Sequence, residues 1–173
     1  MFYNSETKIL IIPPEFNEEL KYLPENVVKI DFAEESLFNQ EIKKGILPNT
    51  LKVLDFSNIY NQEIKEGVIP TNLHTIKIGY FFNKNIVIPE SVKKIQLWSH
   101  NNIINNLPFH IEKVKIVFQN NDREYVGGFK NTKIDNLPPT LTKIVIEDEK
   151  YMIYLTKIPY NCKVQIKRFN KKP

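Results

Sequence analysis

The chain has 173 residues and only one cysteine, Cys162. A single cysteine excludes both an intrachain disulfide and a zinc site built on cysteines, and it favours a reducing compartment. The five glycines leave little material for nucleotide-binding loops, and no glycine-rich phosphate-binding motif occurs. We therefore expect no bound cofactor.

Long apolar runs are also missing. No stretch approaches the roughly 18 apolar residues that cross a bilayer, and residues 1–20 contain no basic segment followed by an apolar one. Asn-x-Ser/Thr glycosylation sites are absent as well. These absences predict an intracellular protein that does not enter a membrane.

Residues arranged for catalysis or metal binding are equally scarce. The three histidines, His74, His100 and His110, do not have the spacing of a metal site. Adjacent carboxylates such as Glu18-Glu19 and Glu34-Glu35 are neighbours in sequence, which does not make a facing acid and base pair. The sequence therefore predicts a protein that is not an enzyme and holds no metal.

Charge is divided unevenly along the chain. Residues 1–86 carry 9 basic and 12 acidic side chains, whereas residues 87–173 carry 15 and 8, within a net charge of +4. The basic half suits an anionic partner, and the plainer interpretation is a solvated lysine-rich surface.

An internal repeat dominates the sequence. Leu-Pro or Ile-Pro pairs recur at steps of 19 to 30 residues. They stand at Leu23-Pro24, Leu47-Pro48, Ile69-Pro70, Ile88-Pro89, Leu107-Pro108, Leu137-Pro138 and Ile158-Pro159. Aromatic-Asn pairs recur every 22 residues, at 16–17, 38–39, 60–61 and 82–83. Such a period is the signature of a solenoid.

Each repeat predicts one coil of that solenoid. Apolar residues recur after each proline, as in Leu51, Leu54 and Phe56, and the last two alternate with one variable residue as in a short strand. The rest of the coil is too short for a full helix, so an irregular or short 3₁₀ return is expected. Stacked coils share one core. We predict a mainly β, right-handed, leucine-rich-repeat-like solenoid of about seven coils with a parallel sheet on one face.

The repeats predict a single domain over residues 1–173. Residues 1–22 form the N-terminal cap and first coil, and residues 23–157 the repeats, with an insert at about 118–136. Residues 158–173 form the C-terminal cap and a basic tail.

The repeated asparagines and aromatic residues are assigned structural roles. Equivalent residues of successive coils stack, so their amides can form a ladder that satisfies unpaired backbone groups at the bend. The predicted ladder is Asn17, Asn39, Asn61 and Asn83. The preceding aromatic residues would fill the core behind it.

Recognition is expected on the variable strand positions, which form the open face of the sheet. Lysine fills seven of the fourteen positions in its first two columns. Lys94 and Lys113 would lie roughly 5 Å apart, a repulsion of about 0.8 kcal/mol in water that an anionic partner would relieve. Trp98, the only tryptophan, lies on the same face, as an interface anchor or folded over the sheet rim. The predicted partner-binding surface is Lys77, Lys94, Gln96, Trp98, Lys113 and Lys115.

The repeat resembles a known family. Residues 47–56, LPNTLKVLDF, followed by Tyr60-Asn61, Gly67 and Ile69-Pro70, resemble the FNIP repeat, named for Phe-Asn-Ile-Pro. This family is similar to leucine-rich repeats and is known chiefly from social amoebae and from giant viruses that infect amoebae. The resemblance implies a protein-interaction module, located in the host cytoplasm or the virion if the protein is viral. Some viral members carry an F-box before the repeats, but residues 8–12 already match the first strand, so we expect no F-box function.

The sequence thus favours a non-enzymatic scaffold that binds a protein partner, with an acidic partner as one option, on the exposed face of the sheet. The alternative is a structural or packaging component that binds an anionic polymer such as nucleic acid. The basic half supports this alternative, but the aromatic residues of a base-stacking platform are few. The sequence does not predict an oligomeric state.

Overall fold

The computed structural model describes residues 1–33, 35–118 and 131–167. Nine strands form one sheet in which spatial order follows chain order. The strands are β1 (Phe2–Asn4), β2 (Ile9–Ile12), β3 (Lys29–Phe32), β4 (Val53–Asp55), β5 (Thr75–Lys77), β6 (Lys94–Trp98), β7 (Lys113–Val117), β8 (Lys143–Ile146) and β9 (Lys163–Ile166). β1 is antiparallel to β2, and all later neighbours are parallel.

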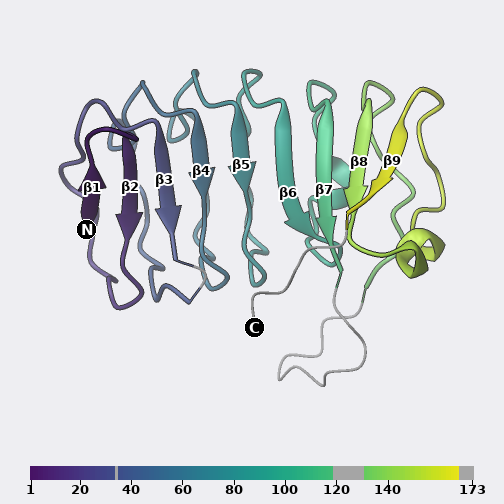
Figure 1. Ribbon diagram of the computed structural model, residues 1–173, viewed down its shortest axis with the longest axis horizontal. Helices are drawn as coiled ribbons and strands as arrows, with labels where there is room; N and C mark the ends of the chain where they lie inside the picture. The colour runs from purple at the N-terminus through teal and green to yellow at the C-terminus, as the bar shows by residue number, and fades with distance from the viewer. Residues whose placement is uncertain (34, 119–130, 168–173) are drawn as a thin grey trace.

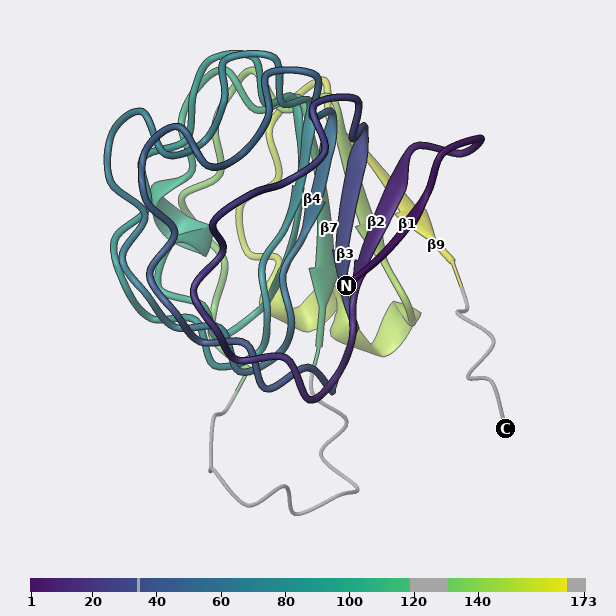
Figure 2. The same cartoon turned by 90° about the vertical axis from the view of Figure 1, so that its left-hand side faces the viewer.

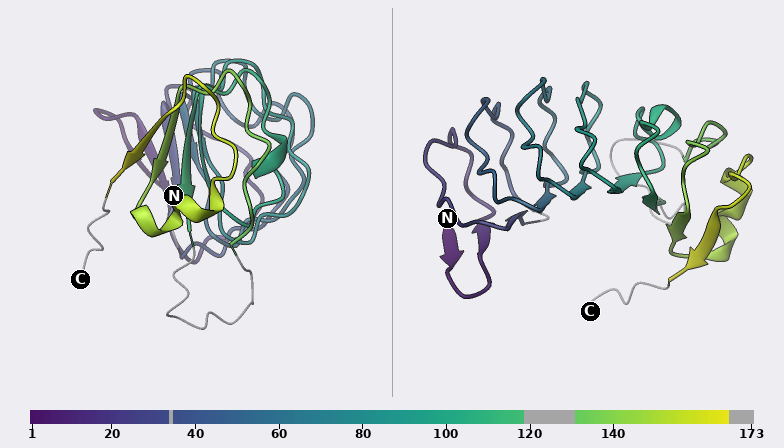
Figure 3. Two further views of the ribbon diagram at one scale, coloured as in Figure 1. Left: turned by 90° about the vertical axis from the view of Figure 1, so that its right-hand side faces the viewer. Right: turned by 90° about the horizontal axis from the view of Figure 1, so that it is seen from above.

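The strands and returns wind into a solenoid of about seven turns, which confirms the mainly β, leucine-rich-repeat-like fold. Figure 1 shows the strands side by side along the longest axis of the molecule. Seen from the N-terminal end in Figure 2, the coils stack behind one another, with the strands on one side and the returns on the other. Seen from above, in the right-hand view of Figure 3, the returns fan outward from an arc whose inner side carries the strands. The sheet therefore lines the concave face.

Each X-Pro pair opens a tight turn that explains the spacing of the repeat. The proline carbonyl accepts a hydrogen bond from the backbone N–H three residues later, as in Pro48 to Leu51 and Pro70 to Leu73, both at 3.0 Å. The same bond occurs after the other five X-Pro prolines, at 2.9 to 3.3 Å. Since the turn reverses the chain before the strand begins, the residue three positions after proline points into the core. Leu51 and Leu73 are fully buried.

The core lies between the sheet and the returns, and stacked aromatic rings fill its N-terminal half. The rings of Phe38 and Tyr60 are parallel within 2° and their centroids are 5.8 Å apart. Phe32 and Phe56 pack against them from the strands, at 4.7 Å and 4.2 Å respectively. Phe16 ends the stack at 6.1 Å from Phe38 and is only half-buried, because no earlier coil covers it. The aromatic-Asn pairs at 16–17, 38–39 and 60–61 thus each add one ring to a continuous column.

The N-terminus differs from the simple repeat pattern. β1 folds back on β2 through a turn in which Oδ1 of Asn4 accepts hydrogen bonds from the N–H groups of Glu6 and Thr7, at 3.0 Å and 2.9 Å. Lys8 completes the turn with a left-handed φ of 57°. This antiparallel strand covers the N-terminal edge of the parallel sheet. The repeat spacing does not predict it, because the turn depends on Asn4 rather than on a glycine or a proline.

The returns are irregular apart from two short 3₁₀ helices, η1 (Ile104–Asn106) and η2 (Glu149–Tyr154). Most of the predicted insert, residues 119–130, and the tail at residues 168–173 lie outside the described residues. Within the described part of the insert, Ile134 forms a parallel bridge with Leu155 of the next coil.

Candidate partner-binding surface

The strand register builds two columns of side chains on the concave face. In the first column, Lys94 of β6 pairs with Lys113 of β7, Lys113 with Lys143 of β8, and Lys143 with Lys163 of β9. We call these four residues the lysine row. Because adjacent parallel strands lie about 4.8 Å apart, the four lysine side chains leave the sheet from neighbouring backbone positions.

The second column runs beside the lysine row. Lys77 of β5 pairs with Gln96, Gln96 with Lys115, Lys115 with Val145, and Val145 with Gln165. This column is therefore mixed, with two lysines, two amides and one apolar side chain.

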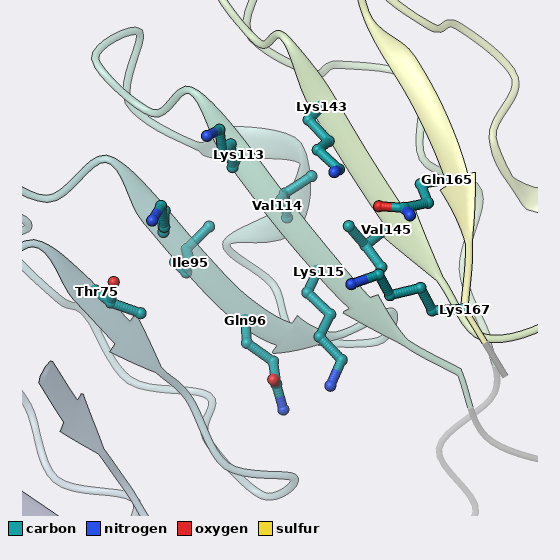
Figure 4. Close-up of a pocket in the computed structure, with 11 residues that line it drawn as sticks. Thr75, Ile95, Gln96, Lys113, Val114, Lys115, Lys143, Val145, Gln165 and Lys167 are labelled. Atoms are coloured by element: carbon teal, nitrogen blue, oxygen red, sulfur yellow. The ribbon is translucent and has the colours of Figure 1, made fainter. Parts of the chain in front are cut away.

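A hollow of about 320 Å³ lies over strands β5 to β9, between the two columns. Figure 4 shows the side chains of Lys115, Lys143 and Lys167 around Val145 in this hollow. The lining residues are Thr75, Lys94, Ile95, Gln96, Lys113, Val114, Lys115, Lys143, Val145, Gln165 and Lys167. Among the described residues, this lining contains five lysines and no carboxylate, so the charges around the hollow are positive.

Two carboxylates of this face lie at the other end of the sheet, and both are paired with lysines. Asp31 lies 2.6 Å from Nζ of Lys29 on the same strand, and Asp55 lies 3.0 Å from Nζ of Lys77 on the next strand. The Asp55 side chain is only 16% exposed. Burial raises the pKa of Asp55, and the positive charge of Lys77 opposes that rise without cancelling it.

The lysine row differs from that end of the sheet in its counterions. Within the described residues, no carboxylate lies at ion-pair distance from Lys94, Lys113, Lys143 or Lys163. Burial lowers the pKa of Lys115, which lies beside the row, and the charge of Lys77 lowers it further, whereas Glu147 acts in the opposite direction. The local environment therefore disfavours further positive charge, and an anion bound here would relieve it.

The structure divides the predicted surface into three parts. Lys94, Gln96, Lys113 and Lys115 line the hollow together. Lys77 is outside that lining and forms an ion pair with Asp55.

Trp98 belongs to the third part, at the end of β6. Its ring meets the ring of Tyr80 edge-on at a centroid distance of 4.9 Å, and the ring of His100 lies 6.1 Å away. Its backbone N–H donates to Oδ1 of Asn101 at 2.7 Å. Trp98 thus packs over the sheet rim and does not line the hollow.

Several residues that line the hollow are not part of the predicted partner-binding surface. Lys143, Gln165 and Lys167 line the same space from β8, from β9 and from the residue after β9. The sequence already points to Lys143, which continues the first column five residues after its proline, whereas Lys163 follows its proline by four residues.

The asparagine ladder lies in the returns, away from this surface. Oδ1 of Asn17 accepts from the N–H of Asn39 at 2.9 Å, Oδ1 of Asn39 from Asn61 at 2.8 Å, and Oδ1 of Asn61 from Asn83 at 3.0 Å. Each side chain therefore joins one coil to the next through a backbone group that the return leaves unpaired. The ladder therefore links successive coils through hydrogen bonds.

Other kinds of site are not visible in the part of the chain that the structure covers. Over residues 1–33, 35–118 and 131–167 there is no group of three or more potential metal ligands. Among the same residues, we find no helix with the length and apolar character that a bilayer crossing requires.

Comparison with known proteins supports the resemblance drawn from the repeat. The FNIP Repeat family matches residues 38–81, and a search of the curated proteins gives no significant match. Among solved structures, a similar chain is CroV588, a circular leucine-rich-repeat protein of a giant virus. It is 28% identical, with a TM-score of 0.60, over 79% of this chain and 20% of its own length. The chain thus spans about a fifth of that relative. It is similar to the FNIP repeat family at residues 38–81 and to a viral leucine-rich-repeat protein over most of its length.

Proposed function

We propose that this protein is a non-enzymatic scaffold that binds a partner protein on the concave face of its sheet. The proposed surface comprises Lys77, Lys94, Gln96, Trp98, Lys113 and Lys115. The observation that carries the proposal is the hollow over β5 to β9, in which Lys94, Lys113 and Lys143 have no carboxylate at ion-pair distance among the described residues. Repeat folds of this kind present extended concave surfaces to other macromolecules, and the single cysteine favours a reducing, intracellular location.

Charge reversal of the surface tests this proposal. The double variant Lys94→Glu/Lys113→Glu places two carboxylates in the hollow, whereas Lys84→Glu/Lys157→Glu makes the same change of net charge on exposed residues of the returns. Both variants leave the buried core intact, which circular dichroism and thermal unfolding check. Partners captured from the native cell, and quantified by mass spectrometry, are expected to be lost with the first variant and kept with the second. Equal capture by both folded variants would refute the proposed surface.

Trp98→Ala separates the contribution of the rim from that of the hollow. Tryptophan often supplies a large part of the binding energy of an interface. Loss of capture by folded Trp98→Ala places the rim within the interface, and unchanged capture confines the interface to the hollow.

A second candidate function is the binding of an anionic polymer such as nucleic acid, and the lysine row favours it. Lysines that neutralise phosphates release counterions, so binding to a nucleic acid weakens steeply with salt. A partner protein held by the hollow and by Trp98 together would show a weaker salt dependence. Salt titration of the captured complex therefore distinguishes the two candidates.

A further inference from the structure

We propose that the lysine row holds an acidic segment of the partner polypeptide, which crosses strands β6 to β9 over the hollow. This inference rests on the proposed function and specifies its ligand chemistry. It also moves the centre of the interface from Lys77 and Trp98 toward Lys143 and Lys163.

Charge complementarity is the first support. Lys94, Lys113, Lys143 and Lys163 start from adjacent register positions and, among the described residues, have no carboxylate at ion-pair distance. Asp31 and Asp55 of the same face are already held by lysines at the far end of the sheet, and Glu147 acts on Lys115 beside the row. The sheet therefore carries an end with paired charges and an end at which the four lysines of the row have no carboxylate at ion-pair distance within the described part of the chain, and an acidic ligand would select the second.

The size of the site fits a short stretch of peptide. Four strands about 4.8 Å apart span roughly 14 Å, which an extended chain covers with about four or five residues. The hollow of about 320 Å³ is at the lower end of the range for a binding pocket. A few acidic side chains therefore match both the length of the row and the space beside it.

The second column favours a peptide over a phosphate polymer. Val145 contributes an apolar side chain to the hollow, and the amides of Gln96 and Gln165 can both donate and accept hydrogen bonds. Oε1 of Gln165 is buried without a hydrogen-bond partner among the described residues. A peptide backbone offers donors and acceptors to such amides, whereas phosphate offers acceptors only. Trp98, the aromatic residue on which a base would have to stack, packs against Tyr80 instead.

Every basic side chain described on this face is a lysine, because the two arginines of the sequence, at positions 123 and 168, lie outside the described residues. Lysine acts as a point charge and lacks the planar fork with which arginine selects carboxylate or phosphate geometry. The row should therefore respond to the density of negative charge, and glutamate and aspartate peptides should bind comparably.

Fluorescence anisotropy with the purified full chain tests this inference. The probes are labelled hexaglutamate, hexaaspartate, hexaglutamine and a thymidine hexanucleotide, at low ionic strength. Hexaglutamate and hexaaspartate are expected to bind with similar affinity, and hexaglutamine not to bind. The double variant Lys113→Gln/Lys143→Gln is expected to weaken the acidic peptides by about tenfold or more, since two charge-assisted contacts are lost. The matched control Lys84→Gln/Lys157→Gln removes the same charge from the returns and is expected to leave binding within about twofold.

Three results would overturn the inference. One is tighter binding of the hexanucleotide than of hexaglutamate, which assigns the row to nucleic acid. Another is an equal loss in the two double variants, which assigns binding to net charge. The third is no binding of any probe, which makes the row a solvated surface. In that last case the proposed function still stands if the Lys94→Glu/Lys113→Glu variant loses partner capture, so the two failures are distinguishable.

Discussion

Nζ of Lys77 lies 3.0 Å from Oδ1 of Asp55, across two neighbouring parallel strands. The two residues occupy the same position in successive repeats. The change from an acidic to a basic residue at this position therefore places two opposite charges in contact. Along the sequence this change indicates a switch in what the surface recognises. In the structure it is an internal ion pair. The lysines that lack a carboxylate at ion-pair distance among the described residues begin one strand later, at Lys94.

Removing the lysine of this pair should destabilise the fold. Lys77→Met leaves the Asp55 side chain, which is 16% exposed, without its counterion. We expect a loss of about 1 to 2 kcal/mol in the free energy of unfolding, because a partly buried charge then lacks compensation. Urea denaturation measures this loss, and the double variant Asp55→Asn/Lys77→Met should recover most of it. A double variant as unstable as the single one would show that Lys77 acts through packing instead.

Asp55 should also give the fold a specific pH dependence. Burial raises the pKa of Asp55 in the folded state above its ordinary value. The Asp55 carboxylate is therefore protonated at a higher pH in the folded protein than in the unfolded chain. Over the window between those two pKa values, acidification therefore stabilises the wild type relative to Asp55→Asn. Urea denaturation of both proteins from neutral pH to about pH 4 measures the difference. If the wild type instead loses stability relative to the variant, the ion pair with Lys77 outweighs burial.

The asparagine ladder offers a matched pair of substitutions. Asn61→Ala removes the acceptor for the N–H of Asn83, 3.0 Å away, and should cost about 1 kcal/mol in the free energy of unfolding. Asn83→Ala removes the same amide from the next coil. No described backbone N–H donates to the Asn83 side chain, and the contact from Asn102 goes to its backbone carbonyl. Asn83→Ala should therefore cost only a few tenths of a kcal/mol. Equal losses for the two variants would contradict a structural role for the ladder.

Gly79 should tolerate no side chain, because its coil lies directly on the backbone of the preceding one. A Cβ atom at this position would be 1.9 Å from the carbonyl oxygen of Ser57. Gly79→Ala is expected to lower the free energy of unfolding by about 3 kcal/mol or more. Gly45→Ala is the control, since its φ of 85° gives alanine a backbone penalty of about 1 kcal/mol while no atom lies within 4 Å. Similar losses for the two substitutions would show that the coils can separate at Gly79.

The repeat could be predicted from the sequence because a small set of local rules recurs in every coil. The proline turn places Leu51 and Leu73 in the core, and the alternation after it assigns each strand residue to a face. Register follows from stacking identical turns, which is why the first column could be predicted from spacing alone as far as Lys143.

Features that depend on the direction of an individual side chain or on an interaction that occurs only once were not predictable in this way. The pairing of Lys77 with Asp55 and the packing of Trp98 against Tyr80 both require the direction of a side chain, which spacing does not give. The N-terminal hairpin depends on one local interaction at Asn4 that occurs once and leaves no period. The sequence therefore predicted which face of the sheet carries the candidate site, and the structure was needed to locate the centre of the site on that face.

The measurement that most directly tests the concave face as the binding surface is lysine footprinting. The protein is acetylated with and without its captured partner, and mass spectrometry gives the protection of each lysine. We predict strong protection of Lys94, Lys113, Lys143 and Lys163 when the partner is bound, with Lys65, Lys84 and Lys157 of the returns modified equally in both samples. Protection of the return lysines with the lysine row still reactive would contradict the account.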